Sequence, residues 1–292
     1  MTVYLISGAS GYLGGLMRDW LRGRGHRVLT LGRRPEDDLF ADFAGHEIIL
    51  PSGFDPPEEP VFVHLAAANE LLCRSDPLAA YRLNVMGTHL ALKFCREQNI
   101  RRFAYVSTRH VFGPSGGAVT ETGLPEPTGH YGLSHLLAEE AVANFSGVAT
   151  RILRPSNIFG MPASLGRFDR WSLIPFGFCR EAVEQNRIVL KTPGTQSINF
   201  VHGAAVAQAV EQFGDLPEIL HVAGPETLSV RAFAFLVGDV LKTDFGREIT
   251  VEHPEAAPDA LPDLLFTSAF GPRQEGETLR GFVRSLCAAL LN

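Results

Sequence analysis

The stretch VYLISGASGYLGGLM, residues 3–17, contains an apolar strand, a glycine-rich turn and the start of a helix. Gly8, Gly11 and Gly14 form a G-x-x-G-x-x-G pattern in the turn. Glycine lets the backbone approach a pyrophosphate closely, and the unpaired N–H groups at a helix start favour an anion. The stretch therefore predicts a dinucleotide-binding turn that also includes Tyr12 and Leu13. The alternative is a glycine-rich turn that binds nothing.

Beyond this stretch, strands alternate with helices as far as residue 155. The predicted strands are Arg27–Leu31, a weaker one near His46–Leu50, Val61–Leu65, Arg102–Ser107 and Val148–Leu153, and the predicted helices are Pro77–Gln98 and Tyr131–Asn144. Strands that alternate with long helices need crossover connections, which produce a parallel sheet with helices on both faces. The predicted fold class is α/β, with a doubly wound parallel sheet.

After Pro155 the alternation becomes irregular, and a second lobe is expected. Its candidate elements are helices near Leu173–Glu184, Ala204–Phe213, from Ser229 and near Glu275–Leu291, and strands Ile188–Leu190 and Ile219–Val222. We expect a dinucleotide-binding domain at residues 1–155 and a smaller C-terminal α/β substrate lobe over most of 156–292. Segments within about 188–215 are candidates for returning to the first domain.

The composition indicates a globular protein that binds small molecules. The chain has 292 residues, 45% hydrophobic and 20% charged, and a net charge of -6 from 26 basic and 32 acidic residues. Disordered and collagenous chains are excluded, and no run of basic residues favours nucleic acid or an anionic membrane. The cysteines are far apart, and no apolar run suits a membrane span or secretion signal. We therefore expect a cytoplasmic protein with reduced thiols.

Several short motifs, taken in order along the chain, resemble the extended short-chain dehydrogenase/reductase family of sugar-nucleotide epimerases and reductases. Besides the glycine turn, the motifs are residues 63–67 (VHLAA), 84–88 (NVMGT), 105–108 (YVST), 111–113 (VFG), Tyr131, 154–160 (RPSNIFG), 200–202 (FVH) and 224–230 (GPETLSV). The resemblance covers nearly the whole chain. It implies a Rossmann-type first lobe.

The resemblance also assigns residues to a cofactor site. It implies that the glycine turn and the backbone of Leu65, Ala66 and Ala67 cradle the dinucleotide. It further implies that Pro155, Asn157 and Ile158 line the nicotinamide, that Ser107 and Tyr131 belong to the cofactor site, and that Asn84 supports that site from its helix.

The end of the second strand bears on the choice between NADP and NAD. An acidic side chain there would accept hydrogen bonds from the ribose 2′-hydroxyl, whereas an arginine would pair with a 2′-phosphate. This chain has Gly32, Arg33 and Arg34 there, with no carboxylate. NADP is therefore favoured over NAD, because both arginines can bind phosphate. The alternative is that they are solvated loop charges.

The resemblance places Thr108 and Tyr131 at the reacting carbonyl or hydroxyl group. In the family, a lysine four residues after the tyrosine supplies the positive charge that lowers the phenol pKa from about 10. His135 occupies that position here. We expect His135 to bind the nicotinamide ribose and, when protonated, to assist Tyr131. The alternative is that the site has lost its chemistry.

Other departures from the family pattern narrow the chemistry. Arg109 and His110 replace the acid and base of the family's 4,6-dehydratases, so dehydration is disfavoured. Ile198 and Asn199 replace the Arg-Asp pair that precedes Phe-Val-His in members that hold a nucleotide diphosphate. This puts such substrates in doubt, unless another arginine substitutes; the candidates are Arg180, Arg187 and Arg273. No histidine spacing indicates a metal site.

The sequence as a whole predicts an NADP-dependent reductase or epimerase that acts on a hydroxyl or ketone of a sugar or sugar nucleotide. Tyr131 would be the acid/base, Thr108 would polarise the substrate oxygen and His135 would hold the ribose. The alternative is a dinucleotide-binding protein with little or no turnover, acting as a sensor or structural partner. The resemblance also implies a homodimer that pairs through the helices at 77–98 and 131–144.

Overall fold

The computed structural model describes residues 1–113, 117–255 and 264–292. Its larger lobe contains an eight-stranded sheet with the order β12-β8-β6-β5-β1-β2-β3-β4. The strands are β1 (Val3–Ser7), β2 (Arg27–Gly32), β3 (Leu39–Asp42), β4 (Glu47–Ile49), β5 (Val61–His64), β6 (Arg102–Val106), β8 (Ala149–Pro155) and β12 (Ile219–Val222). All neighbours are parallel except β3 and β4. The predicted α/β class with a parallel sheet is confirmed.

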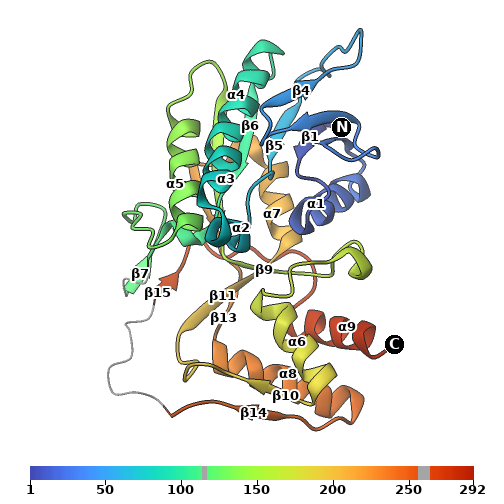
Figure 1. The fold of residues 1–292 in the computed structure, drawn as a ribbon, viewed down its shortest axis with the longest axis vertical. Coiled ribbons are helices and arrows are strands. Elements are labelled where there is room, and N and C mark those ends of the chain that lie inside the picture. Colours follow the sequence, from blue (N-terminus) through green and yellow to red (C-terminus); the bar gives the residue numbers. More distant parts are fainter. Residues whose placement is uncertain (114–116, 256–263) are drawn as a thin grey trace.

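Helices cover both faces of this sheet (Figure 1). On one face lie α1 (Tyr12–Gly23) and α7 (Gly203–Glu211), which bury Met17, Leu21 and Val206 against the strands. On the other face lie α4 (Gly87–Glu97) and α5 (His130–Ala143). Strand β5 is buried on both sides, as expected for a central strand of a doubly wound sheet.

The helix predicted over 77–98 is interrupted. It consists of α3 (Pro77–Tyr81), a π-helical turn η1 (Arg82–Met86) and α4, and a further short helix, α2 (Glu70–Ser75), precedes it. Hydrophobic spacing alone does not reveal a π-turn, because the extra residue shifts the pattern only locally. π-turns often occur at functional sites, and this one carries Asn84.

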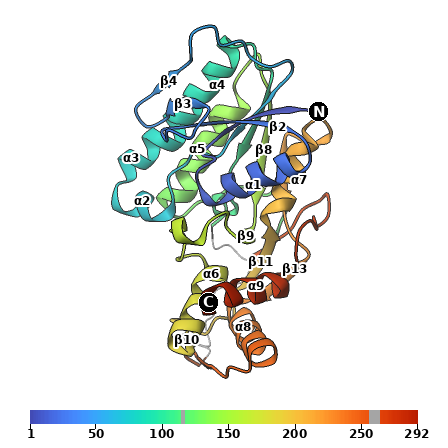
Figure 2. The same ribbon diagram turned by 90° about the vertical axis from the view of Figure 1, so that its right-hand side faces the viewer.

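The smaller lobe is built around three helices with short sheets. Its helices are α6 (Ile174–Gln185), α8 (Val230–Phe245) and α9 (Leu279–Leu291), and its strand sets are β13 (Glu226–Ser229), β11 (Ser197–His202) and β9 (Asn157–Phe159), then β10 (Arg187–Val189) with β14 (Thr250–Glu252). A separate pair, β7 (Gly117–Val119) and β15 (Leu264–Phe266), lies at the side of the larger lobe (Figure 1). The smaller lobe has its own apolar core, which includes Phe176, Phe233 and Phe282. Figure 2 shows the two lobes one above the other.

The chain enters the smaller lobe, returns to the larger lobe and leaves it again. Helix α7 packs on α1, and β12 pairs with β8 at the edge of the large sheet. The returning segment therefore spans 203–222. Strand β10 overlaps the segment at about 188–215 that was a candidate for returning to the first domain. It pairs instead with β14 in the smaller lobe.

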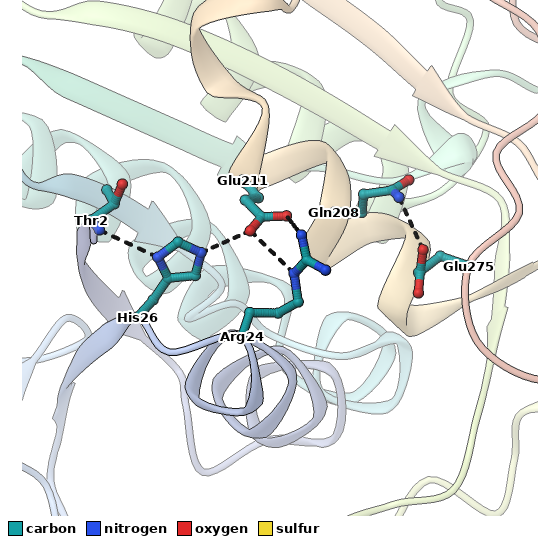
Figure 3. A network of polar contacts seen from close by, with 6 residues as sticks. All are labelled: Thr2, Arg24, His26, Gln208, Glu211 and Glu275. Atoms are coloured by element: carbon teal, nitrogen blue, oxygen red, sulfur yellow. Dashed lines mark hydrogen bonds and ion pairs between the residues drawn. The ribbon is translucent and has the colours of Figure 1, made fainter.

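A polar network fixes the returning helix to the start of the chain (Figure 3). The Glu211 carboxylate lies 2.7 Å from His26 Nε2 and accepts hydrogen bonds from Arg24 at 3.3 Å, and the backbone N–H of Thr2 donates to His26 Nδ1. Burial alone would raise the pKa of Glu211, but the hydrogen bonds from His26 and Arg24 outweigh it and lower the pKa. The ionised Glu211 therefore connects α7 to the α1–β2 turn.

No helix in the described part of the chain is long and apolar enough to cross a membrane.

Candidate active site

The glycine turn between β1 and α1 is close-packed on its own backbone. Gly8 has a φ of 71°, and a Cβ there would lie 2.8 Å from the backbone nitrogen of Ala66. A Cβ at Gly14 would collide with the Gly8 carbonyl and lie 2.8 Å from the Ala9 Cα. The N–H of Gly11 donates to the Gly8 carbonyl at 3.0 Å. The turn therefore has the shape that a close-approaching pyrophosphate requires.

The side chains of Tyr12 and Leu13, which follow Gly11 in the turn, pack within the protein. The Tyr12 hydroxyl donates to the Gly160 carbonyl at 3.0 Å, and its ring packs against Phe168 and Phe176 of the smaller lobe. Leu13 packs in the core beneath α1. The Leu13 side chain therefore belongs to the core, and the Tyr12 side chain connects the turn to the smaller lobe.

The loop after β5 is held against the same turn. Ser7 Oγ accepts hydrogen bonds from the backbone N–H groups of Leu65 and Ala66 at 3.1 and 3.3 Å, and Ser7 also contacts His64 Nδ1 at 2.7 Å. Ala67 is exposed just beyond them. The predicted cradle residues Leu65, Ala66 and Ala67 thus lie beside Gly8.

A cavity of about 740 Å³ lies over the glycine turn and the end of β2. Arg34 lines it, together with Arg18 and Arg22, whereas the exposed Arg33 is not among its lining residues. Asp37 also lines it, and a side chain at Gly32 would collide with the Asp37 carboxylate.

Asp37 places a carboxylate at this strand end, where the sequence predicts none. The chain folds back after β2, so that the Asp37 carboxylate occupies the space left by the missing side chain of Gly32. The backbone N–H of Arg34 donates a hydrogen bond to Asp37 Oδ2 at 3.0 Å and holds the carboxylate there.

Thr108 and Tyr131 come together from different elements. Thr108 caps a short 3₁₀ helix, η2 (Arg109–Val111), just after β6, and Tyr131 is in the first turn of α5. The Tyr131 ring lies 4.8 Å from the ring of His135 and 5.5 Å from that of His110, measured between centroids. The predicted catalytic residues therefore form one cluster at the carboxyl end of the sheet.

The Tyr131 phenol is strongly disposed to stay protonated. Burial raises its pKa well above the usual value, and the charge of Glu70 raises it further. The charge of Arg170 and the Thr108 hydroxyl act in the opposite direction, but less strongly. Arg170 donates to Glu70 at 2.7 Å, so each charge largely offsets the other.

His135 does not replace the charge of a lysine. Its side chain is 2% exposed, and Nδ1 lies 2.8 Å from the Tyr105 hydroxyl. Burial lowers the pKa of His135 to about 3, so the ring is neutral at pH 7. Burial therefore disfavours the protonated His135 that would assist Tyr131. Its Nε2 is buried with no hydrogen-bond partner among the described residues, which leaves a donor or acceptor for a bound group.

Asn84, in the π-helical turn, connects the loop after β5 to α5. Asn84 Oδ1 accepts a hydrogen bond from the Ala68 N–H at 2.6 Å, and Nδ2 donates to Ser134 Oγ at 2.8 Å. Ser134 in turn donates to the Tyr131 carbonyl at 3.0 Å. Asn84 therefore positions both the predicted cofactor loop and the start of the tyrosine helix.

The Ser107 hydroxyl has a hydrogen-bond partner within the protein. It hydrogen-bonds the Glu139 carboxylate, which forms a buried ion pair with Arg154 (Arg154 Nη2 to Glu139 Oε2, 2.6 Å). Arg154 also lies over the Phe112 ring. Sequence reasoning could not find this role, because the three residues are distant in the sequence and meet only across β6, α5 and β8.

A second cavity, of about 870 Å³, lies between the two lobes beside Tyr131. Asn157 lines it, and Asn157 Nδ2 donates to the Asn199 carbonyl at 3.1 Å. Pro155 is buried at the end of β8, and Ile158 packs on the core of the larger lobe. The nearby Ser156 Oγ is buried with no hydrogen-bond partner among the described residues.

These observations fit a nicotinamide dinucleotide. The close-packed glycines, the cavity over them and the unpartnered atoms His135 Nε2 and Ser156 Oγ are what such a group would use. Within residues 1–113, 117–255 and 264–292, no cluster of metal-ligating side chains occurs.

Residues 4–218 match the model of the NAD dependent epimerase/dehydratase family. An uncharacterised UDP-glucose epimerase of Bacillus subtilis is 24% identical over 275 residues (81% of each chain), and a 3-diazoavenalumate denitrifying reductase of a Streptomyces species is 30% identical over 244 residues (76% of each). A solved structure of RMD from Pseudomonas aeruginosa with NADPH superposes with a TM-score of 0.78 at 18% identity, covering 100% of this chain and 99% of that one.

The family match spans more than half of the chain, and the solved neighbour has the same fold along its whole length. The chain therefore belongs to the NAD-dependent epimerase/dehydratase family, as its motifs predicted.

Proposed function

We propose that this protein is a nicotinamide-dependent reductase that converts a ketone of a sugar, sugar nucleotide or comparable small molecule to a hydroxyl. The observation that carries the proposal is the position of Tyr131, which lines the inter-lobe cavity and whose side chain contacts the Thr108 hydroxyl. The family and its similar relatives, among them a reductase, support the reaction class.

The residues act on the substrate oxygen. When bound, the nicotinamide would supply the hydride. Tyr131 then gives its phenolic proton to that oxygen as the hydroxyl forms, so the Tyr131 O–H bond breaks and the substrate O–H bond forms. Thr108 donates a hydrogen bond to the same oxygen and stabilises its negative charge.

Burial disfavours the Tyr131 phenolate, and this weighs more against epimerisation than against reduction. Reduction needs a phenol that gives a proton, whereas epimerisation through a ketone also needs a phenolate that first removes one. The neutral His135 does not stabilise that phenolate. A reductase therefore fits this site better than an epimerase.

The test is turnover by the purified protein. NADPH and NADH are each supplied with a panel of ketones, including keto sugars, and the nicotinamide absorbance is followed. Ketone-dependent oxidation of either cofactor is expected. Cofactor binding without turnover of any ketone would instead support the binding-only alternative, which the absence of a lysine at position 135 favours.

We propose NADP over NAD as the preferred cofactor. Arg34, Arg18 and Arg22 line the smaller cavity, and guanidinium groups suit a 2′-phosphate. Asp37 would repel that phosphate and would accept hydrogen bonds from a 2′-hydroxyl. We therefore expect only a small difference in affinity between NADP and NAD. Titration of both cofactors by tryptophan fluorescence measures it, and tighter binding of NAD would refute the preference.

We also propose a homodimer that pairs through α5 and the helical segment at 77–97. Leu133 and Leu137 on α5 and Leu78 and Met86 on the other segment are exposed apolar side chains. Their grouping on the two predicted pairing elements supports the proposal. Sedimentation at micromolar concentration is expected to give a dimer, and Leu137→Asp is expected to shift it toward a monomer.

A cytoplasmic location is proposed on the basis of the thiols. Cys73, Cys95, Cys179 and Cys287 are all free and buried. Reduced thiols are typical of cytosolic proteins. Thiol titration of the unfolded protein from cell extract, without reductant, is expected to find all of them free.

A further inference from the structure

The charges around the inter-lobe cavity lie on one of its walls. On the side of the larger lobe, Glu70, Arg74, Arg109 and two histidines line it. On the side of the smaller lobe, the described lining residues are uncharged, for example Thr192, Gln196 and Ile198. A charged group of a substrate would therefore be recognised at the larger lobe, near Tyr131.

Arg109 differs from the other charged residues on that wall in being partly buried without an ion-pair partner among the described residues. It directly follows Thr108 in the chain, and its Nε is buried with no hydrogen-bond partner among the described residues. No ion pair to a described carboxylate is formed by its guanidinium, and burial lowers its pKa. A partly buried cation without an ion-pair partner is costly, and binding of an anion reduces the cost.

The only carboxylate among the described lining residues does not neutralise Arg109. Glu70 pairs with Arg170, with a nitrogen-to-oxygen distance of 2.7 Å. Arg74 is exposed and is therefore hydrated. This leaves Arg109 as the one partly buried, unneutralised guanidinium that the structure describes at the cavity.

We propose that Arg109 is a specificity residue that binds a carboxylate of the substrate, close to the carbon that reacts at Tyr131. A guanidinium binds a carboxylate through two parallel hydrogen bonds, and one fixed positive charge matches one negative charge. The substrate class is therefore a keto acid, with a keto sugar acid included. This inference rests on the proposed reductase function and specifies its substrate.

The opposite wall does not offer the alternative, a diphosphate site. Ile198, two residues before Phe200, lines this wall, and none of Arg180, Arg187 and Arg273 lines the cavity. Arg180 lies over the Trp171 ring, Arg273 donates to Gln212 at 2.7 Å, and Arg187 is on β10. The neutral wall suits the uncharged part of a substrate.

The experiment measures binding by calorimetry to protein saturated with NADP. Two matched pairs of probes are used: 4-oxopentanoate with its methyl ester, and D-glucuronate with its amide. UDP is the probe for a diphosphate site. Each probe is titrated into the native protein and the variants Arg109→Met and Arg109→Lys. Arg74→Gln is the matched control, because it removes one positive charge from the exposed edge of the same wall.

At least one acid is expected to bind about tenfold more tightly than its neutral partner, the scale of one charge-assisted contact. Arg109→Met should bring this ratio close to one, Arg109→Lys should keep part of it, and Arg74→Gln should keep most of it. Thermal unfolding of each variant confirms that it is folded.

Equal binding of acid and neutral partner, no measurable binding of either acid, or tight UDP binding unaffected by Arg109→Met would overturn the inference. Ketone turnover is assayed separately. Turnover without any preference for acids refutes only the carboxylate site, whereas acid binding without turnover of any ketone refutes only the reductase function.

Discussion

The glycine turn and the Tyr131 cluster lie along the same edge of the large sheet but are built differently. The turn uses backbone atoms from one continuous stretch, and Gly8 and Gly14 leave no room for side chains. The Tyr131 cluster uses side chains from α2, η2 and α5, together with Arg170 from the smaller lobe. The first region therefore tolerates little change, whereas side chains in the second can change without altering the backbone. The departures from the family pattern at Arg109 and His135 occur in the second region.

Tyr131→Phe tests whether the two regions are separable, and we expect the largest effect from it. Loss of the transferable proton should reduce ketone reduction by a factor of about 10² to 10⁴. The dissociation constant of the cofactor should stay within about twofold of the native value, since the glycine turn is unchanged. Steady-state kinetics and fluorescence titration give the two quantities. An unchanged rate would remove Tyr131 from the mechanism.

Gly14→Ala is the complementary change in the first region. The added methyl collides with the Gly8 carbonyl, and relief of such overpacking typically costs about 1–3 kcal/mol. We expect cofactor affinity to fall by about ten- to hundredfold. Gly23→Ala at the other end of α1 is the control, because nothing lies within 4 Å of its Cβ position. If both variants bind the cofactor like the native protein, the turn is not its site.

Two buried histidines, His135 in the Tyr131 cluster and His64 beside the glycine turn, make the stability of the larger lobe depend on pH. Burial lowers the pKa of His64 and of His135 to about 3, whereas the unfolded value is about 6.5. Below pH 6.5 the unfolded chain therefore binds protons that the folded protein excludes. The stabilisation is fully present above about pH 6.5, and as pH falls toward 3 each histidine removes up to about 1.4 kcal/mol of unfolding free energy per pH unit.

Denaturant unfolding at several pH values measures this slope. His135→Gln should reduce it, and His46→Gln, at an exposed loop position, should not. An identical slope in all three proteins would show that His135 is not buried in its neutral form.

Asp37→Asn changes a single charge inside the cofactor region and has the smallest expected effect. Removal of the carboxylate beside Gly32 should increase the preference for NADPH over NADH by about three- to tenfold, as expected for one partly solvated charge contact. The ratio of the two dissociation constants is the measurement. Asp55→Asn, at an exposed position outside the lining of this cavity, is the control. A shift toward NADH would contradict this role for Asp37.

The sequence predicted most of the larger lobe, because most of its strands and helices have clear hydrophobic periodicity and the glycine turn lies between the first strand and the first helix. It also identified Thr108 and Tyr131, which the structure brings together. It missed Asp37, whose carboxylate reaches the strand end only because the loop after Gly32 folds back. It missed the Glu70–Arg170 pair for another reason: its members are a hundred residues apart, and nothing in either local sequence indicates the other.

The return of α7 and β12 to the larger lobe has a consequence for synthesis on the ribosome. When residue 155 emerges, the lobe still lacks its edge strand and the helix that covers Met17 and Leu21. The apolar face of the sheet stays exposed to solvent or to chaperones until residue 222 has been synthesised. A fragment that ends at residue 155 is therefore expected to aggregate rather than fold by itself, and the two lobes should mature as one unit.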